Sequence, residues 1–221
     1  MAPYEAFLIG EIAYMSSDAN EVLTIGHSAH SWEHFVALLR SARVTAVADV
    51  RSSPYSRRNP HFNRDALSEE LRSNGFSYVF LGKELGGRPS EPRFYCNGVA
   101  DYEKMAQTTE FSKGLNRIVE GTKKYRVVLM CSERDPLDCH RCLLVSRALA
   151  QRGVRVSHIL DVGKVVSHAE IEDGLLKLSG RSTDDLFAPR AERLATAYRE
   201  RAQKVAFAEP NPDPKGPMAA E

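Results

Sequence analysis

The chain has 221 residues, of which 43% are hydrophobic and 27% are charged, and this composition is typical of a globular protein. It excludes collagen, a coiled-coil array and a largely disordered chain, and the length fits one domain with decorations. Thirty basic residues against twenty-nine acidic ones give a net charge of +1. No overall charge therefore attracts nucleic acid or anionic lipid, and any anion-binding site must be local.

The two ends of the chain differ in composition from its middle. Residues 209–221 contain four prolines and few apolar side chains, which predicts a disordered tail. Residues 181–208 predict a C-terminal helix that either packs on a domain at 21–180 or forms a homodimer, and residues 1–20 are an N-terminal extension. The apolar run near the start is flanked by Glu5 and Glu11, so we expect no signal peptide, no membrane contact and a cytoplasmic location.

Between the ends, short β-branched runs alternate with longer amphipathic stretches. The runs predict strands at residues 22–25, 44–50, 76–81, 125–130 and 154–160, and the stretches predict helices at 31–40, 63–74, 102–120 and 136–152. This alternation predicts an α/β fold with a mostly parallel central sheet between two helix layers, a Rossmann-like three-layer sandwich. Ligands of such folds bind beyond the carboxyl ends of the strands, so the residues that follow each strand are the candidates for a site.

The loop after the second predicted strand is rich in arginine. Four arginines and no acidic residue lie between positions 51 and 64, with hydroxyl and amide donors among them. Guanidinium groups bind phosphate or carboxylate in a bidentate manner. Asp49 and Arg51 at the strand end, and Ser56 and Arg57 farther along the loop, are therefore candidate ligand-binding residues.

The loop after the fourth predicted strand carries the most reactive side chains. Cys131 stands at the strand end, where sheet-based enzymes present nucleophiles, and Glu133 offers a carboxylate that can accept a proton. The helix predicted to begin at Pro136 then holds three further candidates in its first two turns: Cys139, His140 and Arg141. In that position the helix dipole and the two basic neighbours favour the thiolate form of the cysteine.

Other strand ends add fewer candidates. His27, after the first strand, is suited to acid–base work, its neighbour Ser28 to ligand binding, and Arg88, after the third strand, to anion binding. Cys142 falls on the apolar stripe of its helix and is predicted to lie in the core. His158 lies inside a predicted strand, where a hydrogen-bonded core role is at least as plausible as catalysis.

A metal site is an alternative reading of Cys131, Cys139 and His140. Their spacing differs from the two-residue knuckles of structural zinc sites, and neighbouring residues of a helix point in different directions. The spacing therefore disfavours a metal at these residues without excluding one, and the sequence does not identify a cofactor.

Four motifs follow one another along the chain. They are Thr24-Ile25-Gly26-His27-Ser28, Asp49-Val50-Arg51-Ser52-x-Pro54-x-Ser56-Arg57, Leu81-Gly82-x-x-Leu85-Gly86-Gly87-Arg88-Pro89 and Leu129-Met130-Cys131-x-Glu133-x-x-Pro136-x-x-Cys139-His140-Arg141. Together they resemble the signatures of the domain of unknown function family 488 (DUF488), from about residue 22 to about residue 168. The resemblance implies a three-layer α/β domain of the bacterial or archaeal cytosol, with no assigned activity. It also implies that the following candidates occupy motif positions: His27, Arg51, Arg57, Arg88, Cys131, Glu133, Cys139, His140, Arg141 and, more loosely, His158 and His168.

Three functional hypotheses follow from these residues. The leading one is an enzyme, a transferase or hydrolase, that binds a phosphorylated or nucleotide-like ligand through its arginines and reacts through Cys131 or Glu133, with His27. The second is a nucleic-acid or nucleotide-binding module without catalysis, whose affinity falls as salt is raised. The third is a metal-binding protein built on cysteine and histidine. A scaffold without a site would need four loops to be polar by coincidence.

Overall fold

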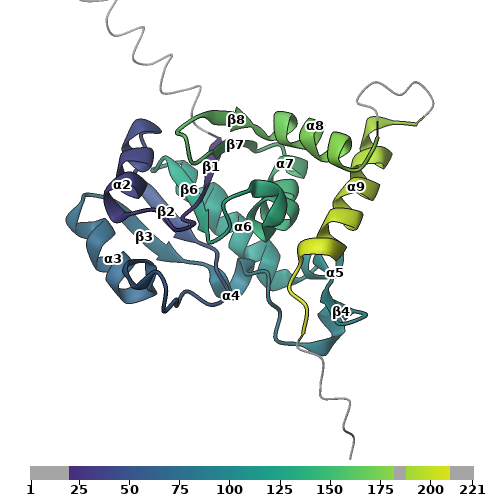
Figure 1. The fold of residues 1–221 in the computed structure, drawn as a ribbon, viewed down its shortest axis with the longest axis horizontal. Helices are drawn as coiled ribbons and strands as arrows, with labels where there is room; N and C mark the ends of the chain where they lie inside the picture. Colours follow the sequence, from purple (N-terminus) through teal and green to yellow (C-terminus); the bar gives the residue numbers. More distant parts are fainter. Residues whose placement is uncertain (1–19, 182–187, 210–221) are drawn as a thin grey trace, which may run out of the picture.

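The computed structural model, which describes residues 20–181 and 188–209, has a six-stranded sheet at its centre (Figure 1). The strands are β1 (Glu21–Gly26), β2 (Ala46–Asp49), β3 (Ser77–Phe80), β6 (Val127–Cys131), β7 (Arg155–Ile159) and β8 (Val165–Ser167). Their order across the sheet is β3-β2-β6-β1-β7-β8. All neighbouring strands run parallel except β8, which is antiparallel to β7.

Helices cover both faces of the sheet, which confirms the predicted three-layer α/β fold (Figure 1). One layer holds α2 (Trp32–Ser41) and α3 (Arg64–Ser73), and the other holds α5 (Tyr102–Ala106), α6 (Thr109–Thr122), α7 (Arg147–Gln151), α8 (His168–Leu178) and α9 (Arg190–Val205). Side chains of a strand alternate between the faces. On β6, Val128 and Met130 therefore pack toward α2 and α3, whereas Leu129 and Cys131 pack toward the larger layer.

The prediction of one continuous helix at residues 102–120 is wrong, because two helices, α5 and α6, occupy this stretch. The chain leaves the helical path at Gln107 and Thr108 between α5 and α6. The hydroxyl of Thr108 accepts a hydrogen bond from the backbone N–H of Phe111 at 3.1 Å. This N-cap starts a new helix where the apolar periodicity alone indicates a continuous one.

The helix predicted at residues 136–152 is also wrong, and the difference matters for the site. It consists of a 3₁₀ turn, η3 (Pro136–Asp138), a π-helical segment, η4 (Arg141–Ser146), and α7. Asp135 caps the turn as expected, since its side chain accepts a hydrogen bond from Leu137 N–H. Cys139 follows with φ −134° and ψ 137°, which is extended backbone. It therefore precedes the helical segment instead of lying in its first turns.

Several smaller elements carry no strong sequence pattern. They are η1 (Pro60–Phe62), α4 (Gly82–Leu85), η2 (Pro92–Phe94) and the two strands of a short hairpin, β4 (Tyr95–Cys96) and β5 (Val99–Ala100). Strand β8 and helix α8 were also not predicted, although Ser167 and Glu170 form a capping box at the start of α8. No helix among the described residues is long and apolar enough to cross a bilayer.

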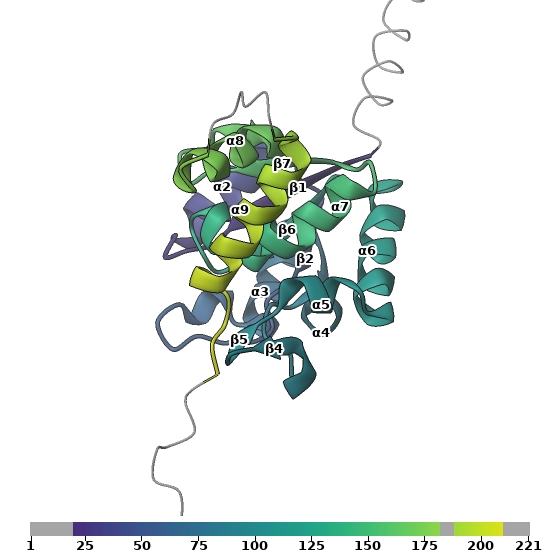
Figure 2. The same ribbon diagram turned by 90° about the vertical axis from the view of Figure 1, so that its right-hand side faces the viewer.

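The predicted C-terminal helix is present as α9, which lies across the larger helix layer (Figure 2). The chain after α9 runs beside the β4–β5 hairpin: Ala100 N–H donates to the carbonyl of Phe207 at 2.9 Å, and Glu209 N–H donates to that of Gly98 at 2.8 Å. Glu209 is thus paired and is not part of a disordered tail. The remainder of the predicted tail, residues 210–221, and residues 1–19 of the N-terminal extension lie outside the described residues.

Candidate active site at the strand ends

A cavity of about 270 Å³ opens at the carboxyl ends of β2 and β6. From β2 the chain turns to α3 on one face of the sheet, and from β6 it turns to α7 on the other face. Open α/β sheets bind ligands where the connections diverge in this way. The cavity wall brings together five of the predicted site residues: Arg51, Arg88, Cys131, Glu133 and His140.

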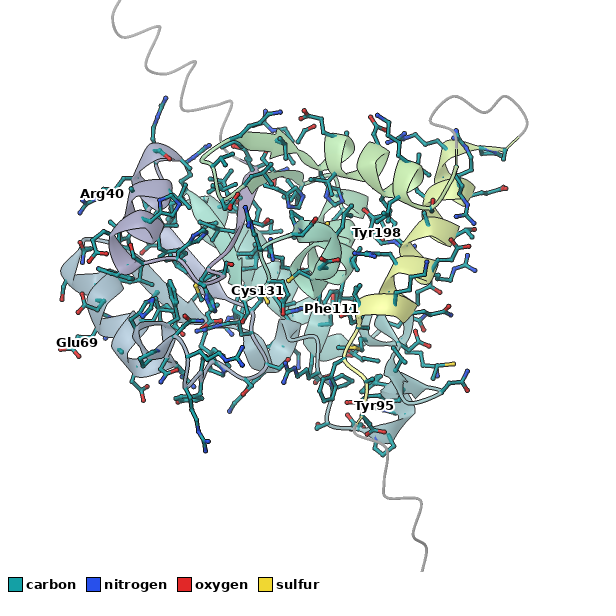
Figure 3. All side chains as sticks on the ribbon, viewed as in Figure 1. Arg40, Glu69, Tyr95, Phe111, Cys131 and Tyr198 are labelled. Atoms are coloured by element: carbon teal, nitrogen blue, oxygen red, sulfur yellow. The ribbon has the colours of Figure 1, made fainter. Side chains whose placement is uncertain are left out.

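The reactive side of the cavity is a cluster of two thiols, a carboxyl group and an imidazole. Oε2 of Glu133 lies 3.0 Å from Sγ of Cys131 and 2.8 Å from Sγ of Cys139. Nδ1 of His140 lies 3.6 Å from Sγ of Cys131. Figure 3 places Cys131 near the middle of the molecule. The four groups come from one loop, yet they converge because the extended backbone of Cys139 turns its thiol back toward Glu133.

Burial dominates the protonation of this cluster. It raises the pKa of Glu133 and, together with the neighbouring Cys139, it raises the pKa of Cys131 well above the ordinary thiol value. Burial also opposes ionisation of Cys139, but the hydrogen bond with Cys131 and the positive charge of Arg141 outweigh it and hold the pKa of Cys139 well below the ordinary value. Of the two thiols, Cys139 therefore ionises first.

The backbone around the cluster is held by buried contacts. Nε2 of His140 lies 2.9 Å from the carbonyl of Val50, to which it donates, so Nδ1 faces the thiols. Arg141 is fully buried, and its guanidinium donates to the carbonyls of Glu133 at 2.6 Å and Arg134 at 3.0 Å. It does not line the cavity, so its positive charge acts on the cluster from the protein interior.

Two glycines of the motifs allow this close packing. A Cβ at Gly26 would lie 1.9 Å from the carbonyl oxygen of Glu133, and a Cβ at Gly87 would lie 2.6 Å from Cγ of His140. Neither distance is possible for a side-chain carbon. Glycine at these positions lets the first and third loops approach the fourth loop closely enough to close the site.

Arg51 is oriented by a buried hydrogen-bond network. Asp49 accepts from its Nε at 2.9 Å and from its terminal nitrogen at 2.7 Å, and Tyr78 donates to the same carboxylate at 3.0 Å. The other terminal nitrogen lies 3.2 Å from Nε2 of His27. Asp49 thus positions Arg51 instead of facing the cavity, while two guanidinium N–H bonds remain for a ligand.

His27 is held in a neutral, fully bonded state. Its Nδ1 lies 2.9 Å from the carbonyl of Ser28, its Nε2 faces the Arg51 guanidinium, and its ring stacks on Phe62 with centroids 4.2 Å apart. Burial, helped by the charge of Arg51, lowers its pKa to about 4. In this geometry His27 supports Arg51, and neither ring nitrogen is free for the acid–base role predicted from sequence.

Three other predicted residues lie outside the cavity wall. Ser28 joins the first and fourth loops through a hydrogen bond from its N–H to the carbonyl of Ser132 at 2.9 Å. The hydroxyl of Ser56 accepts from the N–H groups of Arg58 and Asn59 and so caps a turn. Arg57 is exposed.

Arg88 is the most accessible cation of the cavity. Its backbone N–H donates to the hydroxyl of Ser52 at 2.9 Å, and its guanidinium lies 4.8 Å from the ring centre of Phe207. Within the described ranges, no carboxylate lies within ion-pair distance of it. Tyr102, Val205 and Phe207 also line the wall, together with Asp138, whose carboxylate pairs with Arg201. Sequence reasoning missed Tyr102 and Phe207 because neither belongs to a motif or follows a main strand.

A second polar cluster lies behind the site, between the sheet and α9. Nδ1 of His158 lies 2.8 Å from the Thr24 hydroxyl, and its Nε2 lies 2.9 Å from Nδ1 of His168. Nε2 of His168 lies 3.0 Å from the hydroxyl of Tyr198, which donates to Glu172 at 3.1 Å. Every group in this chain has a partner when both imidazoles are neutral. His158 thus has the hydrogen-bonded core environment considered from sequence, and Cys142 beside it is fully buried, as predicted.

Comparison with known proteins gives one match. The family model described as "Domain of unknown function DUF488" matches residues 31–148, which is more than half of the chain. The matched segment contains the loops after β2, β3 and β6 that form the cavity, and it begins after His27. No curated protein and no solved structure matches the chain.

Proposed function

The chain belongs to the DUF488 family, and from its strand-end cavity we propose that it is an enzyme that acts on a phosphorylated or nucleotide-like small molecule. The observation that carries the proposal is the combination of two arginines with a thiol–carboxyl–imidazole cluster on the wall of one cavity. A volume of about 270 Å³ suits a small ligand better than a polymer.

The cationic side of the cavity fits a phosphate group. Arg51 has a fixed orientation, Arg88 has an uncompensated charge, and the hydroxyls of Ser52, Ser53 and Ser132 add neutral donors on the same wall. Phosphate is bound best by planar guanidinium groups together with such donors. The +1 net charge of the chain supports a local site of this kind over a broad basic surface.

The reactive side supplies a group for proton transfer. Burial raises the pKa of Glu133, and a carboxyl group with a raised pKa can donate or accept a proton closer to neutral pH than an exposed one. Its position on the cavity wall puts it beside a ligand held by the arginines. We therefore assign Glu133 as the proton-transfer residue of a hydrolase or transferase.

Calorimetric titration with inorganic phosphate and with adenosine monophosphate tests the binding half of the proposal. We expect Arg88→Ala to weaken binding about tenfold or more, the loss expected for a charge-assisted hydrogen bond. Arg57→Ala is the matched control, since Arg57 is an exposed arginine off the cavity wall. Equal affinity in the wild type and Arg88→Ala, or no binding of either ligand, would contradict the proposal.

The catalytic half is tested with Glu133→Gln, which keeps the shape of the side chain and removes its titratable proton. Turnover of a panel of nucleoside monophosphates and sugar phosphates can be followed by phosphorus and proton NMR. We expect the variant to bind phosphate as the wild type does and to lose turnover about a hundredfold or more. Undiminished turnover would remove Glu133 from the reaction.

A further inference from the structure

We propose that the reactive cluster is a zinc site whose ligands are Cys131, Cys139, His140 and Glu133. The inference rests on the proposed function and deepens it, because it names what the reactive side of the same cavity would hold. Cys131, Cys139 and His140 hold the ion, and Glu133 is the exchangeable fourth ligand, which leaves the ion when it transfers a proton. Two thiolates, an imidazole and a carboxylate form a donor set that suits zinc better than it suits Mg²⁺, Ca²⁺ or Mn²⁺, which prefer oxygen ligands. All four ligand atoms lie within 4.8 Å of one another.

One separation between the ligand atoms already fits a tetrahedral ion, and the two that involve Glu133 are shorter than such an ion requires. Zinc bonds of the usual lengths put a sulfur and a nitrogen ligand roughly 3.5 Å apart. Nδ1 of His140 and Sγ of Cys131 are 3.6 Å apart. The two sulfur–oxygen separations to Glu133, 3.0 and 2.8 Å, are those of thiol hydrogen bonds. The carboxylate would withdraw by about half an ångström to bind the same ion.

Hydrogen bonds from neighbouring residues already orient the ligand side chains toward a common point. A metal-binding imidazole almost always donates its second ring N–H to a carbonyl or carboxylate, which fixes the other nitrogen toward the ion. His140 does so through its bond to the Val50 carbonyl. The backbone of Glu133 is held by Arg141, and Gly26 leaves the space that this arrangement requires. The ligands would therefore lose little conformational freedom on binding a metal.

Charge also favours an ion here. Cys131 and Cys139 bind Zn²⁺ as thiolates, so any thiol proton that they still carry is released to solvent, and a neutral zinc–dithiolate unit results. The carboxylate of Glu133 then balances the buried guanidinium of Arg141. The cluster as a whole has no net charge in this state, which reduces the cost of burying it.

The second group with metal-ligand chemistry, Cys142, His158 and His168, does not share these features. Its three ligand atoms also lie within 4.8 Å of one another. However, the ring nitrogens of both histidines are already occupied by each other, by Thr24 and by Tyr198. A metal there would have to break a complete hydrogen-bond chain, so this group serves as the internal comparison.

Elemental analysis of the full-length, untagged protein tests the inference. We expect about one zinc ion per chain in the wild type, in Cys96→Ser, which changes an exposed thiol, and in Cys142→Ser, which changes the comparison group. Cys131→Ser and Cys139→Ser should each lose most of the metal. Retention of zinc in both, or its loss only in Cys142→Ser, would overturn the assignment.

Cobalt substitution provides a measurement that does not depend on the folding of variants. Wild-type protein stripped of metal and titrated with Co²⁺ should develop thiolate-to-cobalt charge-transfer absorption and the strong visible bands of a tetrahedral ion. Absence of these bands, or a thiol titration that finds a Cys131–Cys139 disulfide in freshly purified protein, would refute the site. Phosphate titration of the stripped protein separates the two proposals, since Arg88 binds phosphate whether or not the metal is present.

Discussion

Arg141 supports the backbone of the candidate site without lining its cavity. Its guanidinium is fully buried and holds the carbonyls of Glu133 and Arg134. Removing it takes the hydrogen-bond donor from both carbonyls, leaves a hole where a fully buried side chain stood, and removes a positive charge beside the thiols. We expect Arg141→Met to lower the free energy of unfolding by on the order of 3 kcal/mol, measured by urea denaturation.

The control for this prediction is Arg93→Met. Arg93 forms an ion pair with Glu91 in which the two side chains are 71% and 54% exposed. Exposed pairs contribute little, so we expect a change of less than about 0.5 kcal/mol. Similar stability of the two variants would mean that the buried arginine does not hold the loop.

Gly87 sets the distance between the third loop and His140. A methyl group at this position would lie 2.6 Å from Cγ of the imidazole, so the loop or the ring must move. Gly87→Ala should therefore lower the free energy of unfolding by about 1–3 kcal/mol and weaken phosphate binding. In Gly121→Ala, the new Cβ would meet its nearest neighbour, Val127, at 3.6 Å, and the helix should gain up to about 1 kcal/mol. The unfolding temperatures of both variants test this prediction. An unchanged unfolding temperature in Gly87→Ala would mean that the loop does not pack closely against His140.

At the scale of elements, the sequence predicts the sheet better than the helices. Strands buried on both faces read as continuous apolar runs, and each predicted strand is found within two residues of its place. The breaks at Thr108 and Cys139 could not be read in the same way, because both lie inside stretches with helical apolar spacing. Local hydrogen bonds and tertiary contacts decide them, not periodicity.

In the candidate site, too, the residues placed by strand topology were predictable and those placed by local backbone conformation were not. Residues at strand ends, such as Arg51 and Cys131, were predictable because topology alone brings the carboxyl ends of parallel strands together. The convergence of Cys139 on Glu133 was not predictable, since it depends on one residue leaving the helical conformation. Phe207 reaches the wall from the far end of the chain, and only the tertiary fold brings it there.

Helix α9 is connected to α8 by the hydroxyl of Tyr198, shown on this helix in Figure 3, and through His168 of α8 to His158 of β7. Tyr198→Phe removes this partner from Nε2 of the buried His168 and from the half-buried carboxyl group of Glu172. We expect a loss of about 1–3 kcal/mol in urea denaturation. Tyr125→Phe, at a 43% exposed tyrosine, should cost much less. Equal effects would show that the hydrogen-bond chain does not hold α9.

The molecule as a whole is organised around neutral buried imidazoles on both sides of the sheet. His27 lies at the arginine side of the site and His168 lies beneath α9, and burial lowers the pKa of each from 6.5 to about 4. His158 of β7, whose ring contacts His168 of α8, has its pKa lowered in the same direction by burial. Protonation of these rings in the folded state would break the networks that orient Arg51 and fix α9.

The folded protein should therefore lose stability as the pH falls from 6.5 toward 4. In this window the unfolded chain binds protons at His27 and His168 that the folded chain does not, so the free energy of unfolding decreases. The loss is on the order of 2 kcal/mol per imidazole at pH 5 and 3 kcal/mol at pH 4. Glu133, whose pKa is raised by burial, acts in the opposite direction, because its folded form binds a proton first. Urea denaturation at pH 7, 6 and 5 measures the balance, and NMR titration isolates the imidazoles. Titration of His27 and His168 near pH 6.5 in the folded protein would mean that these histidines are not buried in the neutral form.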